Sequence, residues 1–423
     1  MSNFKRTGSV RTHWNIYPTK FAMKTCNPLR TITESMNLVP NPKKKLIPLS
    51  IGDPTVFGNL QACPEIQDAI TEAAASGLHN GYKPTLGWAE ARQAVARYSA
   101  HQGDVKPEDV ILCNGCSSAV DMIISVLVHP GQNILCARPG YSIYGTISAG
   151  FGIELRHYNL LAEHNWEIDL DHLESLIDEK TAALVITNPS NPCGSVFSRG
   201  HIEKIIEIAE RHYLPIIADE IYENIVFPGV EYTSVAALSR NVPVLSCGGL
   251  SKRFLVPGWR LGWIIVHDRN GQLSEIRKGL TNLTGRLLGC NSLVQAALPA
   301  ILRHTPQSFY DELNSSLQNT ALIAYDMLRE IRGLNPVMPQ GSMYMMVGIE
   351  MELFPFDSEM EFVCALVEEQ SVFCLPGECF KFPNFMRIVI TVPAEIMHEA
   401  CARIREFCSQ HRRMDKRIIS NGI

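Results

Sequence analysis

Short apolar segments alternate with longer helix-like segments through the middle of the chain. Val110–Cys113 and Asn133–Ala137 are strand-sized apolar runs, and Ser117–Val128 between them has the length and composition of a helix. Strands that alternate with helices are typical of βαβ units, in which a helix crosses over between two parallel strands. The sequence therefore predicts an α/β protein in which helices cover a mostly parallel sheet.

The same alternation continues downstream of residue 180. Four further strands are expected at Ala182–Thr187, Leu214–Ala218, Val242–Ser246 and Gly262–Val266. Between the first two of them, Ser198 is placed to cap a helix whose apolar residues recur at helical spacing over residues 202–209. With 423 residues, the chain is long enough for one large α/β domain that carries a smaller one.

The pattern changes after about residue 320, where a second and smaller α/β unit is expected. Its helices are predicted at Ala321–Ile331, Glu359–Glu369 and Ala394–Gln410, and its strands at Met343–Ile349 and Arg387–Val392. Residues 20–70 are too irregular to form a domain alone. We therefore expect a small domain made of residues 27–75 and 321–423, and a large domain made of residues 76–320.

The N-terminal segment is basic. Residues 1–33 contain six Lys and Arg residues and no Asp or Glu. Mitochondrial transit segments share this bias, but neither a secretory apolar core nor a clear amphipathic helix is present. We therefore expect residues 1–26 to be a flexible arm and the protein to be cytoplasmic, with a mitochondrial location as the alternative.

Composition disfavours several classes of protein. A formal net charge of −5 gives no general case for binding nucleic acid or acidic membranes. No apolar run approaches the roughly 20 residues that a membrane-spanning helix needs. The 13 cysteines have no regular spacing, which indicates free thiols in a reducing compartment. Cys113 and Cys116 form a lone C-x-x-C pair, which we expect to pack as small apolar residues rather than to bind a metal.

Chemically reactive residues collect where the predicted strands end. Asp219 ends one strand, and Lys252 follows another after a Gly-rich turn. Segments 114–117, 139–141 and 188–194 follow three others. Because ligands bind beyond the carboxyl ends of the strands in an open parallel sheet, we expect these segments to line one site. Neither G-x-G-x-x-G nor G-x-x-x-x-G-K-[ST] is present, so dinucleotide and nucleoside-triphosphate sites are not expected.

These residue types fit the needs of pyridoxal 5′-phosphate. This cofactor requires an amine to form an imine, a carboxylate to keep its ring nitrogen protonated, and donors for its phosphate. Lys252 supplies the amine and Asp219 supplies the carboxylate. The helix N-terminus at residues 115–117 and the guanidinium of Arg260 supply the phosphate donors. Tyr141 offers a ring that can stack on the pyridine.

Asn191 and Tyr222 can both donate hydrogen bonds to the phenolate oxygen of the cofactor. Each candidate residue has an ordinary alternative: a solvated lysine, a helix-capping aspartate, a core tyrosine or an asparagine in a turn. Their joint occurrence at the strand ends favours the cofactor site.

Five segments resemble the fold-type I aminotransferases and follow one another in the order that this family has them. They are Asn80–Gly87, Asn188–Gly194, Asp219–Tyr222, Lys252–Trp263 and Met386–Arg387. The spacing K-x4-P-G-x-R-x-G, which begins at Lys252, is a specific signal within the set. The resemblance covers residues 27–412. It implies a mostly parallel seven-stranded sheet sandwiched by helices, a smaller α/β domain, and a homodimer.

The resemblance also implies a role for each residue of the site. Lys252 is implied to hold the cofactor as an imine and to carry the proton between the substrate Cα and the cofactor. Asp219 is implied to pair with the pyridinium, Tyr141 to stack on the ring, and Tyr222 with Asn191 to bind the phenolate oxygen. Lys252, Asp219 and Tyr222 are thus the expected catalytic residues.

Two anion sites are implied in the same way. The phosphate ligands would be Gly115, Cys116, Ser117 and Arg260, joined by the partner subunit's Tyr82. The α-carboxylate of the substrate would bind Arg387, Gly52 and Asn191. The sequence departs from many relatives at Asn114, Cys116 and Gly249, where Ser or Thr is common, so the exact phosphate ligands stay open.

Three stretches, at residues 49–59, 188–197 and 256–263, are most similar to the members of this family that act on tyrosine. The resemblance implies transfer of the amino group of L-tyrosine to 2-oxoglutarate, in the breakdown of tyrosine and phenylalanine. The products would be 4-hydroxyphenylpyruvate and L-glutamate.

Alternatives stay open. A carbon–sulfur lyase or an aminotransferase of another substrate preference would share this scaffold. A non-catalytic regulator with an aminotransferase-like domain is disfavoured because Lys252 is present. The residues that choose the substrate side chain are not readable from spacing.

Overall fold

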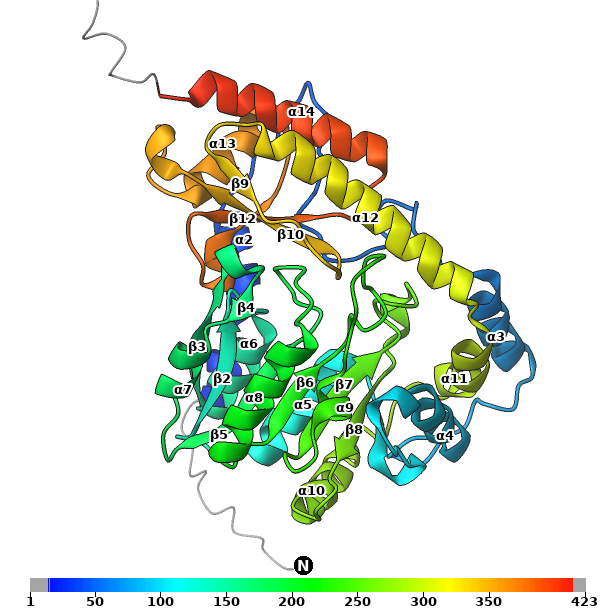
Figure 1. Ribbon diagram of the computed structural model, residues 1–423. Helices are drawn as coiled ribbons and strands as arrows, with labels where there is room; N and C mark the ends of the chain where they lie inside the picture. Colours follow the sequence, from blue (N-terminus) through cyan, green and yellow to red (C-terminus); the bar gives the residue numbers. More distant parts are fainter. Residues whose placement is uncertain (1–13, 15, 414–423) are drawn as a thin grey trace, which may run out of the picture.

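The computed structural model describes residues 14 and 16–413, which form two layered units around separate sheets (Figure 1). The larger sheet has the strand order β1-β8-β7-β6-β5-β2-β3-β4. Its strands are β1 Val110–Cys113, β2 Asn133–Arg138, β3 Glu154–Leu161, β4 Glu167–Ile168, β5 Thr181–Thr187, β6 Ile216–Asp219, β7 Val244–Gly249 and β8 Gly262–His267.

The large sheet is mostly parallel, as predicted. β3, β2, β5, β6 and β7 pair in parallel, whereas β8 runs antiparallel to both β7 and β1. All six strands that the apolar pattern predicted are present, with ends shifted by at most three residues. β3 was not predicted, because only two of its eight residues are fully buried and its sequence lacks a continuous apolar run. The two-residue β4 extends the expected seven strands to eight.

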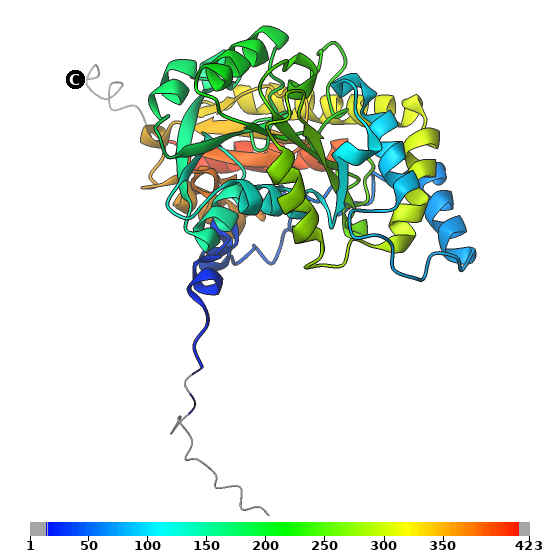
Figure 2. The same cartoon turned by 90° about the horizontal axis from the view of Figure 1, so that it is seen from below.

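Helices cover both faces of this sheet (Figures 1 and 2). Those on one face contribute to a core shared with the small unit: α5 Cys116–Leu127, α6 Ile143–Phe151 and α10 Ser274–Thr284. Those on the other face pack in a second core: α7 Leu170–Ser175, α8 Arg199–Arg211 and α9 Val235–Leu238. The side chain of Ser198 accepts from the backbone N–H of His201, which confirms the predicted cap of α8.

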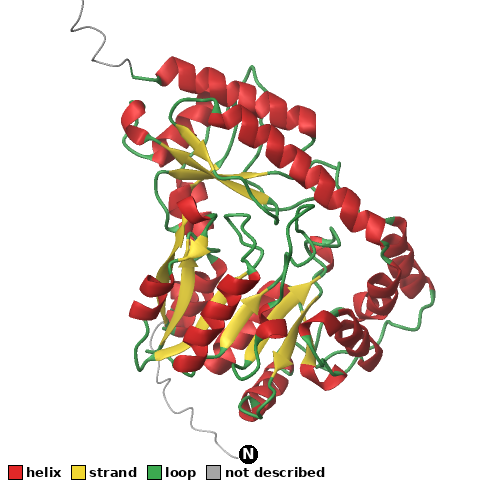
Figure 3. Ribbon diagram, viewed as in Figure 1, coloured by secondary structure: helices red, strands yellow, loops and turns green. Residues whose placement is uncertain are grey.

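The smaller unit is built on an antiparallel sheet with the order β11-β12-β10-β9, seen beneath its helices in Figure 3. Its strands are β9 Leu334–Pro336, β10 Tyr344–Ile349, β11 Leu375–Pro376 and β12 Phe385–Val389. Its helices are α12 Gln307–Arg329, α13 Glu359–Gln370 and α14 Ala394–His411. The helix predicted at Ala321–Ile331 is only the second half of α12, which begins at Gln307 and joins the two units.

The segments before residue 100 are distributed between both units. The backbone of Ile47 bonds to Ser371 and Phe373, beside the small sheet. Helices α3 Pro64–Ala75 and α4 Ala89–Tyr98 instead pack against α11 Ser292–His304, at the β1–β8 side of the large sheet. The predicted division into domains stays a prediction. It assigned the residues of α3 to the small domain, whereas α3 packs against α11 beside the large sheet.

Two short helices lie near the N-terminus of the described chain. The helix α1 Lys20–Lys24 lies against α6, where the rings of Phe21 and Phe151 are 5.1 Å apart. It is followed by α2 Pro28–Ser35, which packs against Phe380 and Leu375. The helical, packed part of the predicted flexible arm therefore starts at Lys20. Residues 1–13 and 15 lie outside the described residues, so the transit-segment alternative stays a prediction.

Two expectations drawn from composition concern the described part of the chain. No helix within it is both long and apolar enough to cross a membrane. All 13 cysteines lie within it and are free thiols. The expectation for the C-x-x-C pair holds for Cys113, which is buried in β1, but Cys116 also donates its thiol to Asp219 at 3.4 Å. Cys116 is thus a polar contact of the site rather than simple packing.

A glycine marks the place where the turn 188–194 meets the small unit. Gly194 has a φ of +70°, and a Cβ atom there would lie 2.4 Å from the carbonyl oxygen of Tyr344. Its own carbonyl accepts from the backbone N–H groups of Gln340 and Gly341 at 2.8 and 2.9 Å. The turn can approach the small unit this closely only because the residue has no side chain.

We expect Gly194→Ala to reduce the free energy of unfolding by about 2–4 kcal/mol, because a strained φ and a backbone clash add together. Thermal unfolding of the two proteins measures the effect. Gly200→Ala is the matched control, since Gly200 lies in α8 with no atom near its virtual Cβ, where alanine is the better helix former. Equal melting temperatures for Gly194→Ala and the parent protein would contradict the expectation.

Candidate functional site

A cavity of about 520 Å³ lies where the carboxyl ends of β5, β6 and β7 face the small sheet. Ten of the twelve residues predicted for the site line it. They are Gly52, Cys116, Ser117, Tyr141, Asn191, Asp219, Tyr222, Lys252, Arg260 and Arg387. The strand ends therefore converge as the parallel topology requires.

Lys252 is the amine of the cavity. It lies in the irregular segment between β7 and β8, and its Nζ donates to the carbonyl oxygen of Gly52 at 2.5 Å. Gly52 comes from the N-terminal part of the chain, so this contact joins segments 200 residues apart. A primary amine held by a single backbone carbonyl keeps two N–H donors free for a ligand.

Asp219 is the buried carboxylate at the end of β6. Its Oδ2 accepts from the hydroxyl of Tyr144 at 2.7 Å, and its Oδ1 accepts from the thiol of Cys116 and from the backbone N–H of Ile221 at 3.3 Å. Burial raises the pKa of this carboxyl above its usual value, although these three donors oppose the shift. None of these partners is positively charged, so the carboxylate is oriented but not neutralised.

An anion cup lies at the start of α5. Arg260 has a φ of +54° and donates to the carbonyl oxygens of Pro257 and Asn114 at 3.0 and 3.2 Å. A Cβ atom on Gly115 would lie 2.6 Å from Nη2 of Arg260, so glycine is needed for the guanidinium to reach this place. The first N–H groups of α5 and the helix dipole favour an anion here.

Ser251 is a further residue of this cup that the sequence analysis did not name. It lines the cavity, directly before Lys252. Gly249, where the resemblance implied a serine in other members of the family, presents no side chain. The presence of a serine two residues later was a readable signal, because a hydroxyl next to Lys252 can donate to an anion.

Arg387 is a buried cation on β12. Its Nη1 donates to Oδ1 of Asn191 at 3.1 Å and its Nη2 to the carbonyl oxygen of Ser50 at 2.7 Å. Its Nε is buried without a hydrogen-bond partner among the described residues. Burial lowers the pKa of the guanidinium, and only neutral atoms surround it. A carboxylate that enters the cavity would supply the missing opposite charge.

Tyr344 is the most consequential residue that the sequence analysis missed. Its hydroxyl lies 2.8 Å from the hydroxyl of Tyr222, and the guanidinium of Arg387 lies 4.3 Å from the centre of its ring. Burial opposes ionisation of Tyr344, but the charges of Lys252 and Arg387 outweigh it and lower its pKa. The expected strand at Met343–Ile349 contained this tyrosine, yet nothing in its spacing pointed to the cavity.

Tyr141 and Asn191 complete the polar lining. Burial raises the pKa of Tyr141 to about 12, so its ring is neutral at physiological pH. Its ring meets that of Tyr144 edge to face at 6.1 Å. Asn191 uses its side-chain oxygen for Arg387, which leaves its amide N–H groups as the donors available to a ligand.

The two remaining predicted residues differ in their positions. Gly115 borders the cavity through its contact with Arg260. Tyr82 does not reach the cavity within one chain: it is 90% exposed and lies in a separate surface hollow formed by residues 79–83 and 287–293.

The cavity also has an apolar side that the sequence analysis could not identify. Leu29 and Thr33 of α2 line it, together with Ile143, Phe373 and Leu375. These residues come from three separate parts of the chain, so no local pattern connects them. A helix near the N-terminus therefore forms part of the wall of the cavity.

Comparison with known proteins agrees with this geometry. Residues 44–404 match the family model "Aminotransferase class I and II". The chain is 54% identical over 409 residues to the tyrosine aminotransferase of Mus musculus, covering 96% of this chain and 90% of the relative. It is 53% identical to the tyrosine aminotransferase of Homo sapiens, covering 95% of this chain and 89% of the relative.

A solved structure shows the same fold. The crystal structure of tyrosine aminotransferase from Leishmania infantum superposes with a TM-score of 0.91 at 36% identity, covering 95% of this chain and all of the other. The alternative of a non-catalytic regulator is therefore not favoured. The chain belongs to the class I and II aminotransferases, the family that the strand-end residues indicated.

Proposed function

We propose that this aminotransferase uses pyridoxal 5′-phosphate to transfer the amino group of L-tyrosine to 2-oxoglutarate, yielding 4-hydroxyphenylpyruvate and L-glutamate. The choice of tyrosine is supported by the relatives of that name, which match nearly the whole chain at 53–54% identity. The observation that carries the chemistry is the convergence of Lys252, Asp219 and Arg387 on one cavity.

The residues of the cavity fit the cofactor. Asp219 is a buried carboxylate without a cationic partner among its recorded contacts, which suits a protonated ring nitrogen. Arg260 and the N-terminus of α5 form a cup for its phosphate. Lys252 would hold its aldehyde carbon, and Tyr141 would lie against its ring. When bound, the cofactor supplies an electron sink for the charge left at the substrate Cα.

The protein's own groups would then perform binding and proton transfer. Arg387 can hold the α-carboxylate of any amino acid through paired hydrogen bonds, which fixes Cα relative to Lys252. The Nζ of Lys252 would be the base that takes the proton from the substrate Cα and the acid that gives a proton back. Tyr222 and Asn191 would donate to the phenolate oxygen of the cofactor, with Tyr344 holding the hydroxyl of Tyr222.

The apolar side of the cavity supports an aromatic substrate. Leu29, Ile143 and Phe373 offer a surface on which a phenyl ring gains from burial. No dedicated donor for the phenol is evident among the lining residues on that side. We therefore expect the protein to discriminate weakly between tyrosine and phenylalanine.

We expect the purified protein to absorb visible light through its attached cofactor and to lose this band on treatment with borohydride. Borohydride should fix the cofactor covalently to its lysine, and peptide mapping should find the attached cofactor on Lys252, because this lysine is the amine that lines the cavity. Lys278 is a useful comparison, since it lies exposed on α10. A label on Lys278, or on any lysine but Lys252, would overturn the assignment.

We expect kcat/KM with fixed 2-oxoglutarate to be highest for tyrosine, with phenylalanine within about 10-fold and alanine and aspartate lower, because only aromatic rings fill the apolar side. Steady-state rates for the four amino acids measure this order. A preference for alanine or aspartate would leave the aminotransferase intact but remove the tyrosine assignment. Release of pyruvate and ammonia from cystine would favour the carbon–sulfur lyase.

We also propose that the active unit is a homodimer, in which the partner subunit's Tyr82 completes the phosphate cup. The high exposure of Tyr82 in one chain supports a role outside that chain's own cavity. Mixing the inactive variants Tyr82→Phe and Lys252→Ala should restore part of the activity, because hybrid dimers would contain one intact site. Tyr213→Phe, at a tyrosine that is 94% exposed, is the control. A fully active monomer at high dilution would contradict the proposal.

A further inference from the structure

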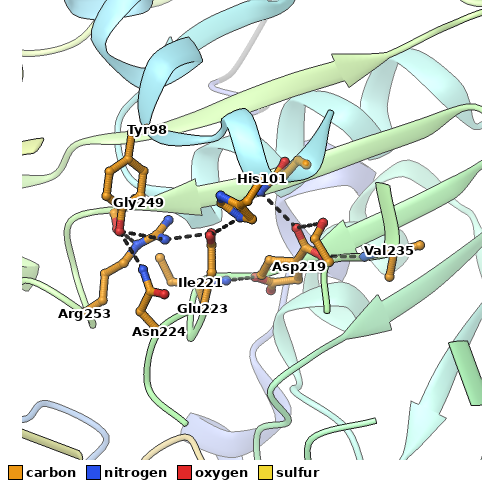
Figure 4. A network of polar contacts seen from close by, with 12 residues as sticks. Tyr98, His101, Asp219, Ile221, Glu223, Asn224, Val235, Gly249 and Arg253 are labelled. Carbon is orange, nitrogen blue, oxygen red and sulfur yellow. Dashed lines mark hydrogen bonds and ion pairs between the residues drawn. The ribbon is translucent and has the colours of Figure 1, made fainter. Parts of the chain in front are cut away.

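A buried ion pair lies behind the loops that carry the active-site side chains. Nη1 of Arg253 is 2.6 Å from Oε2 of Glu223, and the two side chains are 0% and 3% exposed. Figure 4 shows this pair between Tyr98 and His101. Neither residue lines the cavity, so the pair belongs to a cluster that the proposed chemistry does not use.

The positions of the two residues in the chain show which loops the ion pair connects. Arg253 directly follows Lys252, and Glu223 directly follows Tyr222. Both loops leave the ends of adjacent parallel strands, β7 and β6. The ion pair therefore links the two loops at a point one residue beyond each active-site side chain, on the side away from the cavity.

These loops have few backbone contacts of their own. Between β7 and β8, the recorded backbone bonds join Leu250 to Leu261, Lys252 to Leu255, and Val256 to Trp259. The loop after β6 is a turn in which the N–H of Glu223 bonds to the carbonyl of Glu220. The N–H of Glu220 bonds to the carbonyl oxygen of Cys247 at 3.0 Å where the two strands end, and no recorded backbone bond joins the two loops beyond that point. Side chains therefore contribute to the distance between the loops at Tyr222 and Lys252.

Arg253 is enclosed in a way that leaves it little freedom. Its guanidinium carbon lies 5.1 Å from the ring centre of Tyr98 and 5.3 Å from that of Trp263. A Cβ on Gly248 would lie 3.0 Å from Nη2 of Arg253 and 2.5 Å from Trp263, so this glycine makes room for the packed guanidinium. A guanidinium that lies close to two aromatic rings and to a carboxylate has little room to move.

The far side of Glu223 is also occupied. Nε2 of His101 lies 2.5 Å from its Oε1, and Glu220 nearby accepts from the backbone N–H of Val235 at 3.0 Å. The side chain of Asn224 donates to the hydroxyl of Tyr98 at 2.7 Å, which closes the cluster beside Arg253. The carboxylates of Glu220 and Glu223 thus do not line the cavity and are held by polar contacts outside it.

The energetics argue against stability as the main role of the pair. Desolvating two charges costs about as much as their attraction returns, and apolar replacements of similar volume are often neutral or stabilising. What a buried pair does supply is a defined geometry, since only one arrangement satisfies both charges. A group 1 Å out of place can cost a reaction on the order of 100-fold.

We infer that Glu223 and Arg253 are positioning residues that fix Lys252 relative to Tyr222, and thereby set the alignment of the amine with the donors that face it. This inference rests on the proposed function, because it concerns the same amine and the same cofactor. It predicts that the pair affects catalysis and the titration of the bound cofactor more than it affects folding.

The test removes both charges together, in the double variant Glu223→Gln/Arg253→Met of the full-length, cofactor-loaded protein. We expect a melting temperature close to that of the parent, kcat with tyrosine at least ~10-fold lower, and KM changed less than about 3-fold, because Arg387 binds the carboxylate from a different sheet. The pH midpoint of the visible absorbance change should move by at least about half a unit.

The control is a second ion pair with the same separation. Nη2 of Arg277 lies 2.6 Å from Oδ1 of Asp109, at the outer strands of the sheet and next to no predicted site residue. Asp109→Asn/Arg277→Met should leave kcat and the absorbance midpoint unchanged. If the parent protein neither binds the cofactor nor transaminates tyrosine, the proposed function itself is wrong, independently of the role of the ion pair.

Normal kcat and a normal midpoint in the folded double variant would overturn the inference. A double variant that is only partly folded, and whose folded fraction works at the parental kcat, would overturn it as well. If the double variant does not fold, Glu223→Asp decides, because it keeps the charge and shortens the link by one methylene. A reduced kcat with a shifted midpoint then supports the inference, and parental values overturn it.

Discussion

The guanidinium of Arg387 is a positive charge sealed inside the protein with only neutral partners, and the cavity is organised around it. An unpaired buried cation is costly, and here the cost is reduced by the carbonyl of Ser50, the amide oxygen of Asn191 and the ring of Tyr344. These contacts orient the group without neutralising it. Its recorded hydrogen-bond partners are neutral oxygens, so an incoming carboxylate would not have to compete with an existing ion pair.

Asp219 follows the same principle with the opposite sign. Tyr144 and Cys116 orient its oxygens, but neither carries a charge that could satisfy it. The pair Glu223–Arg253 shows the contrasting case, since each charge there already has its partner. Buried charges with only neutral partners mark places for ligands, whereas a mutually satisfied buried pair holds the scaffold. The distinction rests on whether an opposite charge lies beside the buried group, and not on residue type.

The parts of the site that could be predicted are residues that directly follow a recognisable apolar strand. Lys252, Asp219 and Asn191 could be placed because each follows an apolar strand, and the ends of parallel strands meet. β3 escaped prediction because its half-exposed residues give no apolar run. The beginning of α12 was overlooked although Tyr310, Leu313 and Leu317 recur at helical spacing, so that signal was available.

Other contacts depend on segments that only the fold brings together. The hydroxyls of Tyr222 and Tyr344 meet across 122 residues, and the apolar wall combines Leu29 with Phe373. No spacing rule connects such residues, since loop closure over these lengths is fixed by the packing of whole elements. The role of Tyr344 and the composition of the side-chain pocket were therefore beyond single-sequence reasoning.

Three hydrogen bonds join the two units at the cavity. Lys252 reaches Gly52, Tyr222 reaches Tyr344, and Asn191 reaches Arg387. In each pair, one residue follows a strand of the large sheet, and the other belongs to the small sheet or to the segment beside it. Lys252, Tyr222 and Asn191, which are proposed to act on the cofactor, are therefore each held by a residue of the small sheet or of the segment beside it. A movement of one sheet relative to the other would disturb both functions at once, which ties the chemistry of the site to the way in which the two units pack.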